Sequence, residues 1–293
     1  MKPAYFDYVA PPSVAETVSL LGEHGTEASV LAGGQSLLIE MRYRRRRPAI
    51  LIDVNRVAGL SGIALDPASA RLGALVRHAD LERARFADPL AALFRLVAPN
   101  VAHPPIRARG TFAGSLAWAH PAAEWCALAA ALNAEVELRG PYGERRVPAG
   151  AWFLGPFTTA RLPDELVTGV RLPRLGPGTA VRFAEHRRTH ASFALAAVVV
   201  AVRLAAERVA WVRIGLANAA DVPLRAVEAE AVLIGERAGP GPIAEAAEVA
   251  GTEADPVEEP YASVPYRRHV LRTLVRRCLT EAAEAAAAEA ANR

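Results

Sequence analysis

The strongest constraint on the fold of this 293-residue chain comes from two short segments of small residues. Each segment lies directly ahead of a run with helical apolar spacing. The first is Gly33-Gly34-Gln35-Ser36, which follows a predicted strand over residues 28–32, and the second is Thr111-Phe112-Ala113-Gly114-Ser115. We expect both to be turns from a strand into a helix. Small residues there leave backbone N–H groups bare, and the aligned amide dipoles favour phosphate oxygens. Together the two turns predict a diphosphate held from two sides.

Neither segment matches the common nucleotide-binding signatures. No Gly-Lys-Ser/Thr follows them, and no G-x-G-x-x-G precedes a downstream acid, which disfavours P-loop and Rossmann interpretations. Each segment taken alone is also consistent with a simple tight turn. The Ser or Thr in each favours an anion site, but the residues alone leave both interpretations open.

Composition narrows the partners and cofactors. Hydrophobic residues make up 52% of the chain, as in globular proteins, and the net charge of only +3 predicts no nucleic-acid partner. Two cysteines, Cys126 and Cys278, are too few for a Cys-based iron–sulfur or zinc site, so we expect an organic redox cofactor and no metal. The longest apolar run, residues 193–202, is about half as long as a membrane span requires, so we expect no membrane span. The first 13 residues lack the apolar core of a signal peptide, so we expect a cytoplasmic protein.

Hydrophobic periodicity predicts an α+β protein with a boundary in the Pro- and Gly-rich segment 173–178. A strand–helix–strand unit is expected over residues 1–57, and a hairpin over 60–65 and 70–74 opens a second unit over 58–176. Helices are expected over residues 78–85, 89–97 and 121–132. Beyond the boundary we expect strands over 193–204 and 209–217, followed by helices over 226–234, 243–250 and 265–291.

Several motifs occur together in one order, and they carry a family resemblance. They are Ala32-Gly33-Gly34-Gln35-Ser36-Leu37-Leu38, Leu51-Ile52-Asp53-Val54, Leu72-Gly73-Ala74-Leu75-Val76-Arg77-His78-Ala79-Asp80-Leu81, Arg109-Gly110-Thr111-Phe112-Ala113-Gly114-Ser115 and Pro121-Ala122-Ala123-Glu124. The chain resembles the FAD-binding medium subunit of the molybdenum hydroxylases, the family of aerobic carbon monoxide dehydrogenase and bacterial xanthine dehydrogenases. The resemblance implies an FAD-binding domain of the vanillyl-alcohol-oxidase (PCMH) type over residues 1–176, with subdomains of about 1–57 and 58–176. A smaller α+β domain over 177–293 would resemble the carbon monoxide dehydrogenase flavoprotein C-terminal domain.

The resemblance also implies a set of cofactor-binding residues, and it assigns no catalytic residue. Backbone amides of the two glycine segments would hold the FAD diphosphate, with Glu124 at the ribityl or adenosine portion, Leu166 or Val167 near the flavin and Phe193 beside the isoalloxazine. Ala113 stands where the family usually has glycine, and its methyl group predicts weaker or shifted FAD binding. The full set is Ala32, Gly33, Gly34, Gln35, Ser36, Leu37, Thr111, Phe112, Ala113, Gly114, Ser115, Glu124, Leu166, Val167 and Phe193.

The implied function is electron relay. Electrons would pass from a molybdopterin large subunit through an iron–sulfur small subunit to FAD, and then to NAD, quinone or oxygen. Two alternatives stay open: a stand-alone FAD-dependent oxidoreductase with His120 or His190 as proton acceptor, and a flavin-free binding relative. The basic run over residues 42–47 is interpreted as a solvated edge or a docking patch for a partner subunit.

Overall fold

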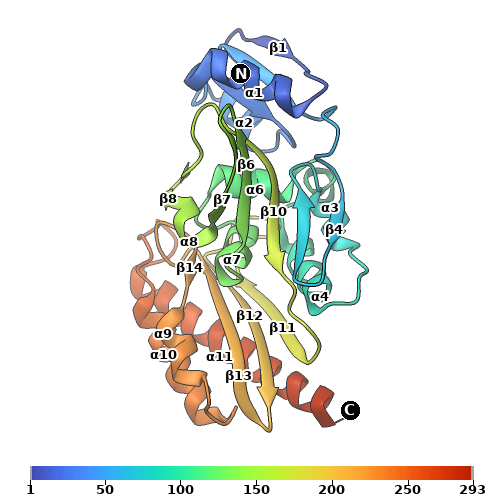
Figure 1. Ribbon diagram of the computed structural model, residues 1–293. Helices are drawn as coiled ribbons and strands as arrows, with labels where there is room; N and C mark the ends of the chain where they lie inside the picture. The colour runs from blue at the N-terminus through green and yellow to red at the C-terminus, as the bar shows by residue number, and fades with distance from the viewer. Residues whose placement is uncertain (1, 292–293) are drawn as a thin grey trace.

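The computed structural model describes residues 2–291 and contains three main sheets stacked along the chain (Figure 1). The N-terminal part lies at one end, a five-stranded sheet with its helices lies in the middle, and a four-stranded sheet with three helices lies at the other end. The predicted α+β class is confirmed.

The N-terminal part is a small parallel sheet of order β1-β3-β2, made of Asp7–Val9, Ile50–Asp53 and Ala28–Leu31. Helix α1 (Val14–His24) begins at Ser13, whose side chain accepts the N–H of Glu16 at 3.2 Å. Helix α2 (Leu37–Arg42) follows β2 after a short loop. This is the strand–helix–strand unit expected from the sequence.

The middle sheet is antiparallel, with the order β4-β5-β10-β6-β7. Its core continues into helices α4 and α6, and also into the sheet of the C-terminal part. Residues 120–123 form a turn in which the N–H of Ala122 donates to His120 Nδ1, so α7 begins three residues later than expected. The bounds are β4 Ile63–Leu65, β5 Ser69–Gly73, β6 Glu135–Gly140, β7 Gly143–Pro148, β10 Leu166–Pro173, α3 His78–Glu82, α4 Pro89–Val97, α5 Pro104–Arg107, α6 Phe112–Trp118, α7 Glu124–Ala131, α8 Ala149–Trp152, β8 Phe153–Gly155 and β9 Thr158–Thr159.

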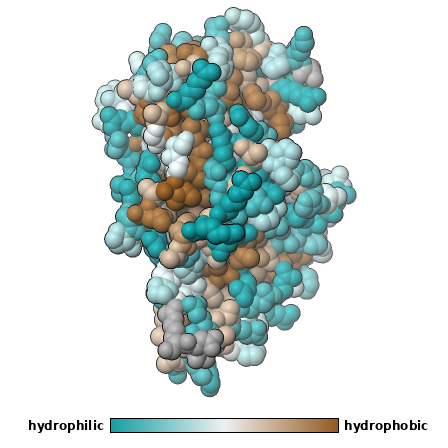
Figure 2. Space-filling view, turned by 90° about the vertical axis from the view of Figure 1, so that its right-hand side faces the viewer, coloured by the Kyte–Doolittle hydropathy of each residue, from teal (hydrophilic) through white to brown (hydrophobic). Residues whose placement is uncertain are grey.

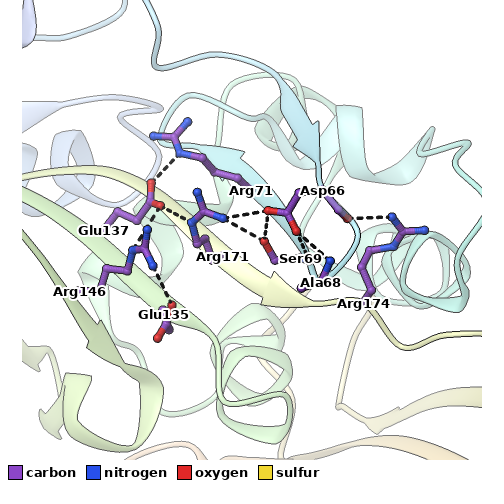
Figure 3. A network of polar contacts seen from close by, with 9 residues as sticks. All are labelled: Asp66, Ala68, Ser69, Arg71, Glu135, Glu137, Arg146, Arg171 and Arg174. Atoms are coloured by element: carbon purple, nitrogen blue, oxygen red, sulfur yellow. Dashed lines mark hydrogen bonds and ion pairs between the residues drawn. The ribbon is translucent and has the colours of Figure 1, made fainter.

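One carboxylate ties four neighbouring strands of this sheet together (Figure 3). Glu137 on β6 accepts from Nε of Arg71 on β5 at 2.6 Å and from Nε of Arg171 on β10 at 2.7 Å, while Arg146 on β7 approaches it to 3.9 Å. Arg171 also reaches Asp66, in the turn between β4 and β5, at 3.1 Å. The network is largely shielded from water at Glu137, so it fixes the strands that carry one wall of the site described below.

The C-terminal part is an antiparallel sheet of order β11-β12-β13-β14, covered on one face by α9, α10 and α11 (Figure 1). Helix α7 packs against the other face. Gly215 on β13 allows this helix to lie close to the sheet, because a Cβ at that position would collide with the Ala127 carbonyl oxygen. The bounds are β11 Thr179–His186, β12 Ala196–Ala205, β13 Arg208–Ala217, β14 Leu224–Arg225, α9 Val227–Leu233, α10 Pro240–Glu253 and α11 Val264–Ala291.

The surface mixes polar and apolar groups. On the face shown in Figure 2, patches of apolar surface lie between hydrophilic side chains, which is normal for a folded protein. Among residues 2–291, no helix has the length and apolar character needed to cross a bilayer.

Candidate cofactor site

A cavity of about 730 Å³ lies between the N-terminal part and the middle part of the molecule. One wall comes from β2, the loop that joins it to α2, and the basic run after α2. The other wall comes from the start of α6, the β8–β9 hairpin and the segment that leads into β10. Its size falls within the range of cofactor sites in proteins.

The loop between β2 and α2 presents a row of backbone donors to this cavity. Within the described chain, the N–H groups of residues 33–37 have no backbone acceptor, and the first to pair is that of Leu38, with the Gly34 oxygen at 3.1 Å. Gly34 has a φ of +73°, in the left-handed region that favours glycine. The loop therefore forms the strand-to-helix anion site that the sequence predicts.

The segment ahead of α6 differs from that expectation. It follows helix α5 rather than a strand, and Thr111 is the N-cap of α6, with its Oγ1 accepting from the Gly114 N–H at 3.0 Å. The N–H of Phe112 donates to the Val76 oxygen at 3.1 Å, and that of Ser115 to the Thr111 oxygen at 3.1 Å. The prediction of a second strand-to-helix turn with bare donors is therefore wrong for three of the five residues, because the start of α6 uses the N–H groups of Gly114 and Ser115 and the Val76 oxygen accepts that of Phe112. The N–H groups of Thr111 and Ala113 remain without a backbone acceptor in the described residues.

The two segments touch each other through their backbones. A Cβ built on Gly33 would lie 2.6 Å from the carbonyl oxygen of Arg109 and 2.7 Å from Cα of Gly110. Gly33 thus allows the loop before α2 to close against the loop before α6, and the two predicted segments border one cavity.

The structure places most of the predicted residues on the cavity wall, with three exceptions. Phe112 points into the core, where its ring lies 5.3 Å from that of Trp125. Glu124 is buried and does not line the cavity. Phe193 lies outside the wall and stacks on His120, with ring centroids 4.0 Å apart. The residues on the wall are Ala32, Gly33, Gly34, Gln35, Ser36, Leu37, Thr111, Ala113, Gly114, Ser115, Leu166 and Val167.

An aromatic cluster lies at the cavity, beside the stacked rings of His120 and Phe193. Trp118 and Phe157 line the wall with ring centroids 5.5 Å apart, and Trp118 lies 5.8 Å from Phe193. His120 joins them, and burial lowers its pKa to about 4, so the ring is neutral at pH 7. Such rings offer a flat apolar surface to a fused aromatic ligand.

Glu124 is protonated at neutral pH. Burial, assisted by the neighbouring Glu185 carboxylate, raises its pKa to about 8 against the lowering effects of its own backbone N–H and of Arg187. Burial also raises the pKa of Glu185, to about 7. The buried Glu124 carboxyl group therefore holds a proton and no charge at neutral pH, and it does not contact the cavity.

His78 on α3 is a wall residue that the sequence analysis did not select. Its Nδ1 accepts from Trp125 Nε1 at 3.0 Å, and burial together with Arg107 and Arg77 lowers its pKa to about 3. The ring is therefore neutral and carries its proton on Nε2, the atom that a Cβ at Gly110 would meet at 2.6 Å. The resemblance motif contains this residue, but only the fold brings it to the cavity.

The cavity wall also contains polar residues for which the sequence predicts no cofactor role. They are Ser29, Arg46, Thr159, Arg161 and Glu165. Arg46 lies in the basic run that was interpreted as an edge or a docking patch. The other four carried no local pattern that distinguishes them from ordinary strand and loop residues.

A cavity between two α/β units, with a row of bare amides on one wall and aromatic rings beside the other, defines a protein that binds a nucleotide cofactor with a flat ring system. Two family models match the sequence: the FAD binding domain in molybdopterin dehydrogenase over residues 4–175, and the CO dehydrogenase flavoprotein C-terminal domain over residues 181–282. The chain belongs to the FAD-binding medium subunits of the molybdenum hydroxylase family. Its cofactor is FAD, and it is an FAD-dependent oxidoreductase subunit.

Individual relatives match over nearly the whole length. The chain is 37% identical to the 6-hydroxypseudooxynicotine dehydrogenase complex subunit alpha of Paenarthrobacter nicotinovorans, covering 96% of each chain. It is 34% identical to the carbon monoxide dehydrogenase medium chain of Hydrogenophaga pseudoflava, covering 96% of this chain and 98% of that one. The solved carbon monoxide dehydrogenase of the same organism superposes with a TM-score of 0.92 at 35% identity, covering 98% and 99% of the two chains. Quinoline 2-oxidoreductase from Pseudomonas putida 86 superposes with a TM-score of 0.90 at 29% identity, with the same coverage.

Proposed function

We propose that this subunit holds FAD across the cavity and relays electrons from a molybdenum- and iron–sulfur-containing partner to an acceptor. The observation that carries the proposal is the row of bare amides at residues 33–37, closed from the other side by the loop before α6. Bound FAD supplies the ability to take up and release electrons, and the protein contributes binding and orientation.

The proposed cofactor contacts follow from the donors on the wall. The amides of residues 33–37 bind the diphosphate, helped by the N–H of Ala113 and by the hydroxyl groups of Ser36 and Ser115. Leu166 and Val167 give apolar contact on the β10 side, and Trp118 borders the isoalloxazine, with Phe193 behind it.

The relatives of this chain support the proposed partners. One is a subunit of a dehydrogenase complex and the other is a medium chain, which implies further chains. We propose an iron–sulfur small subunit and a molybdopterin large subunit as partners, and NAD, quinone or oxygen as acceptor. We also propose a domain boundary at residue 176, where the two family matches approach each other.

The stand-alone oxidoreductase has less support, because neither candidate histidine presents a free basic nitrogen at Nδ1. His120 Nδ1 accepts the N–H of Ala122 at 3.0 Å, so the neutral ring carries its proton on Nε2. His190 Nδ1 accepts from Arg187 at 3.3 Å, since an arginine can only donate. Neither residue lines the cavity.

The test is isolation of the tagged chain from its native cell, followed by analysis for flavin, molybdenum and iron. We expect FAD with the chain and molybdenum and iron in the same complex, and we expect the flavin absorption to bleach when the complex receives its substrate without acceptor. The control is the complex depleted of FAD, which should keep its metals and lose electron transfer to the acceptor. A yellow chain that purifies alone and is reduced directly by a small organic substrate would refute the relay.

A further inference from the structure

Two arginines from different parts of the chain stand on the wall of the FAD cavity. Arg46 follows α2, and its Nε donates to Ser29 Oγ on β2 at 3.2 Å. Arg161 lies between β9 and β10, and its NH1 donates to the carbonyl oxygens of Leu162 and Glu165 at 3.0 and 2.8 Å. These bonds fix where each guanidinium group stands and leave the other donors of each group without a partner in the described residues.

Glu165 and Asp164 lie near enough to raise the pKa of Arg161, but no carboxylate bonds directly to either guanidinium group of this pair among the described residues. Glu165 is held by Arg145 through two bonds of 2.5 and 2.8 Å, and Glu40 lies 3.7 Å from Arg45. Among the described residues, neither Arg46 nor Arg161 forms an ion pair. The two cations are close enough that the charge of Arg46, after burial, contributes to lowering the pKa of Arg161.

Two like charges that face one cavity repel each other, and partial burial makes the charge of Arg161 more costly. An anion between them would remove both penalties. The diphosphate of FAD carries two negative charges at neutral pH, one for each guanidinium group of the pair. Guanidinium groups also match phosphate oxygens in bidentate geometry and stack on flat rings.

The position of Ser29 indicates which half of FAD is involved. Ser29 precedes Gly33 by four residues on β2, which is up to about 13 Å of extended chain from the row of bare amides. Arg46, bonded to Ser29, therefore lies toward the β2 end of the amide row, whereas the loop before α6 meets that row at Gly33. From a diphosphate on the amides, one half of the cofactor extends toward the aromatic cluster and the other toward the arginines.

We infer that Arg46 and Arg161 bind the adenosine diphosphate half of FAD and offset its charge. The inference rests on the proposed binding of FAD in this cavity. It gives one residue of the basic run a cofactor role in place of a purely solvated or partner-docking role.

The test measures the dissociation constant of FAD by flavin fluorescence, using the full chain freed of cofactor. The variants are Arg46→Gln, Arg161→Gln and the double variant. Arg47→Gln is the matched control, because it removes the same charge from the same run, and Arg47 does not line the cavity. Thermal unfolding of every variant verifies that the fold is kept.

We expect each single variant to raise the dissociation constant of FAD about tenfold and the double variant to raise it further, whereas Arg47→Gln leaves it unchanged. ADP should compete with FAD on the wild type and lose potency on the double variant, and riboflavin, which lacks the diphosphate, should bind all variants alike. Arg161→Lys separates the two sources of affinity: retained affinity with a steep salt dependence points to the phosphates, and lost affinity points to adenine stacking.

Equal FAD affinity of the wild type and the double variant would overturn the inference and leave the proposed function standing. So would an equal loss in the Arg47→Gln control. A wild-type chain that takes up no FAD overturns the proposed function and the inference with it.

Discussion

Replacing Gly33 by alanine tests whether the contact between the two loops shapes the cofactor cavity. The added Cβ would lie 2.6 Å from the Arg109 carbonyl oxygen, about 0.8 Å inside the 3.4 Å at which ordinary contact begins. Both neighbours of this Cβ are backbone atoms, so the loops must separate. Overpacking of this kind costs about 1–3 kcal/mol, which for a protein of this size lowers Tm by about 2–5 °C. The separation also removes at least one amide contact to the diphosphate, and a charge-assisted bond is worth about tenfold or more in affinity.

Two measurements on the same preparations check this prediction: thermal unfolding without cofactor and the dissociation constant of FAD. Gly22→Ala is the control, because a Cβ at that position on α1 meets nothing within 4 Å. It should be neutral or stabilising by up to about 1 kcal/mol, with unchanged FAD binding. If Gly33→Ala keeps both the wild-type Tm and the wild-type affinity, the loops do not depend on this contact and the reasoning fails.

Three further substitutions test other parts of the structure. Trp125→Phe removes the donor to His78 Nδ1 and leaves a buried acceptor unpaired, so we expect urea unfolding to show a loss of about 1–3 kcal/mol. Glu137→Gln should destabilise the protein by a similar amount, because it weakens the network across four strands. The control Arg139→Gln breaks an exposed pair with Glu144 and should change stability by less than about 1 kcal/mol. Equal effects of the two substitutions would contradict the assigned role of the network. Glu124 has its pKa raised to about 8 in the folded state, so the folded protein keeps a proton that the unfolded chain releases above about pH 4.5, and this contribution to stability falls as pH rises to about 8. Across that pH range the Tm from thermal unfolding should fall less steeply for Glu124→Gln than for the wild type. Equal slopes of Tm against pH would show that Glu124 does not hold a proton in the folded state.

The sequence predicts the fold well where periodicity and turn signals agree. The helix over 89–97 has its observed bounds, because Asp88 caps it and Pro89 opens it. The strand expected from residue 193 begins only at Ala196, because apolar composition does not separate a buried strand from the turn that precedes it.

The site is predicted less completely. The amide row at residues 33–37 follows from local sequence, since glycine and small residues between a strand and a helix produce it. The state of the second loop does not, because the N–H of Phe112 is paired with the Val76 oxygen, which only the fold brings to that loop. Arg161 and His78 reach the cavity only through pairing and packing that link distant parts of the chain, so no local pattern reveals them.

The backbone contact at Gly33 also limits how this protein can be altered by exchange of parts. The loop before α2 fits only against a second loop whose main chain passes next to Gly33 with no side chain between them. A transplant of one loop from a relative therefore has to include the other. In sequences derived from this chain, we expect position 33 to remain glycine, because every atom that a Cβ there would meet belongs to the main chain.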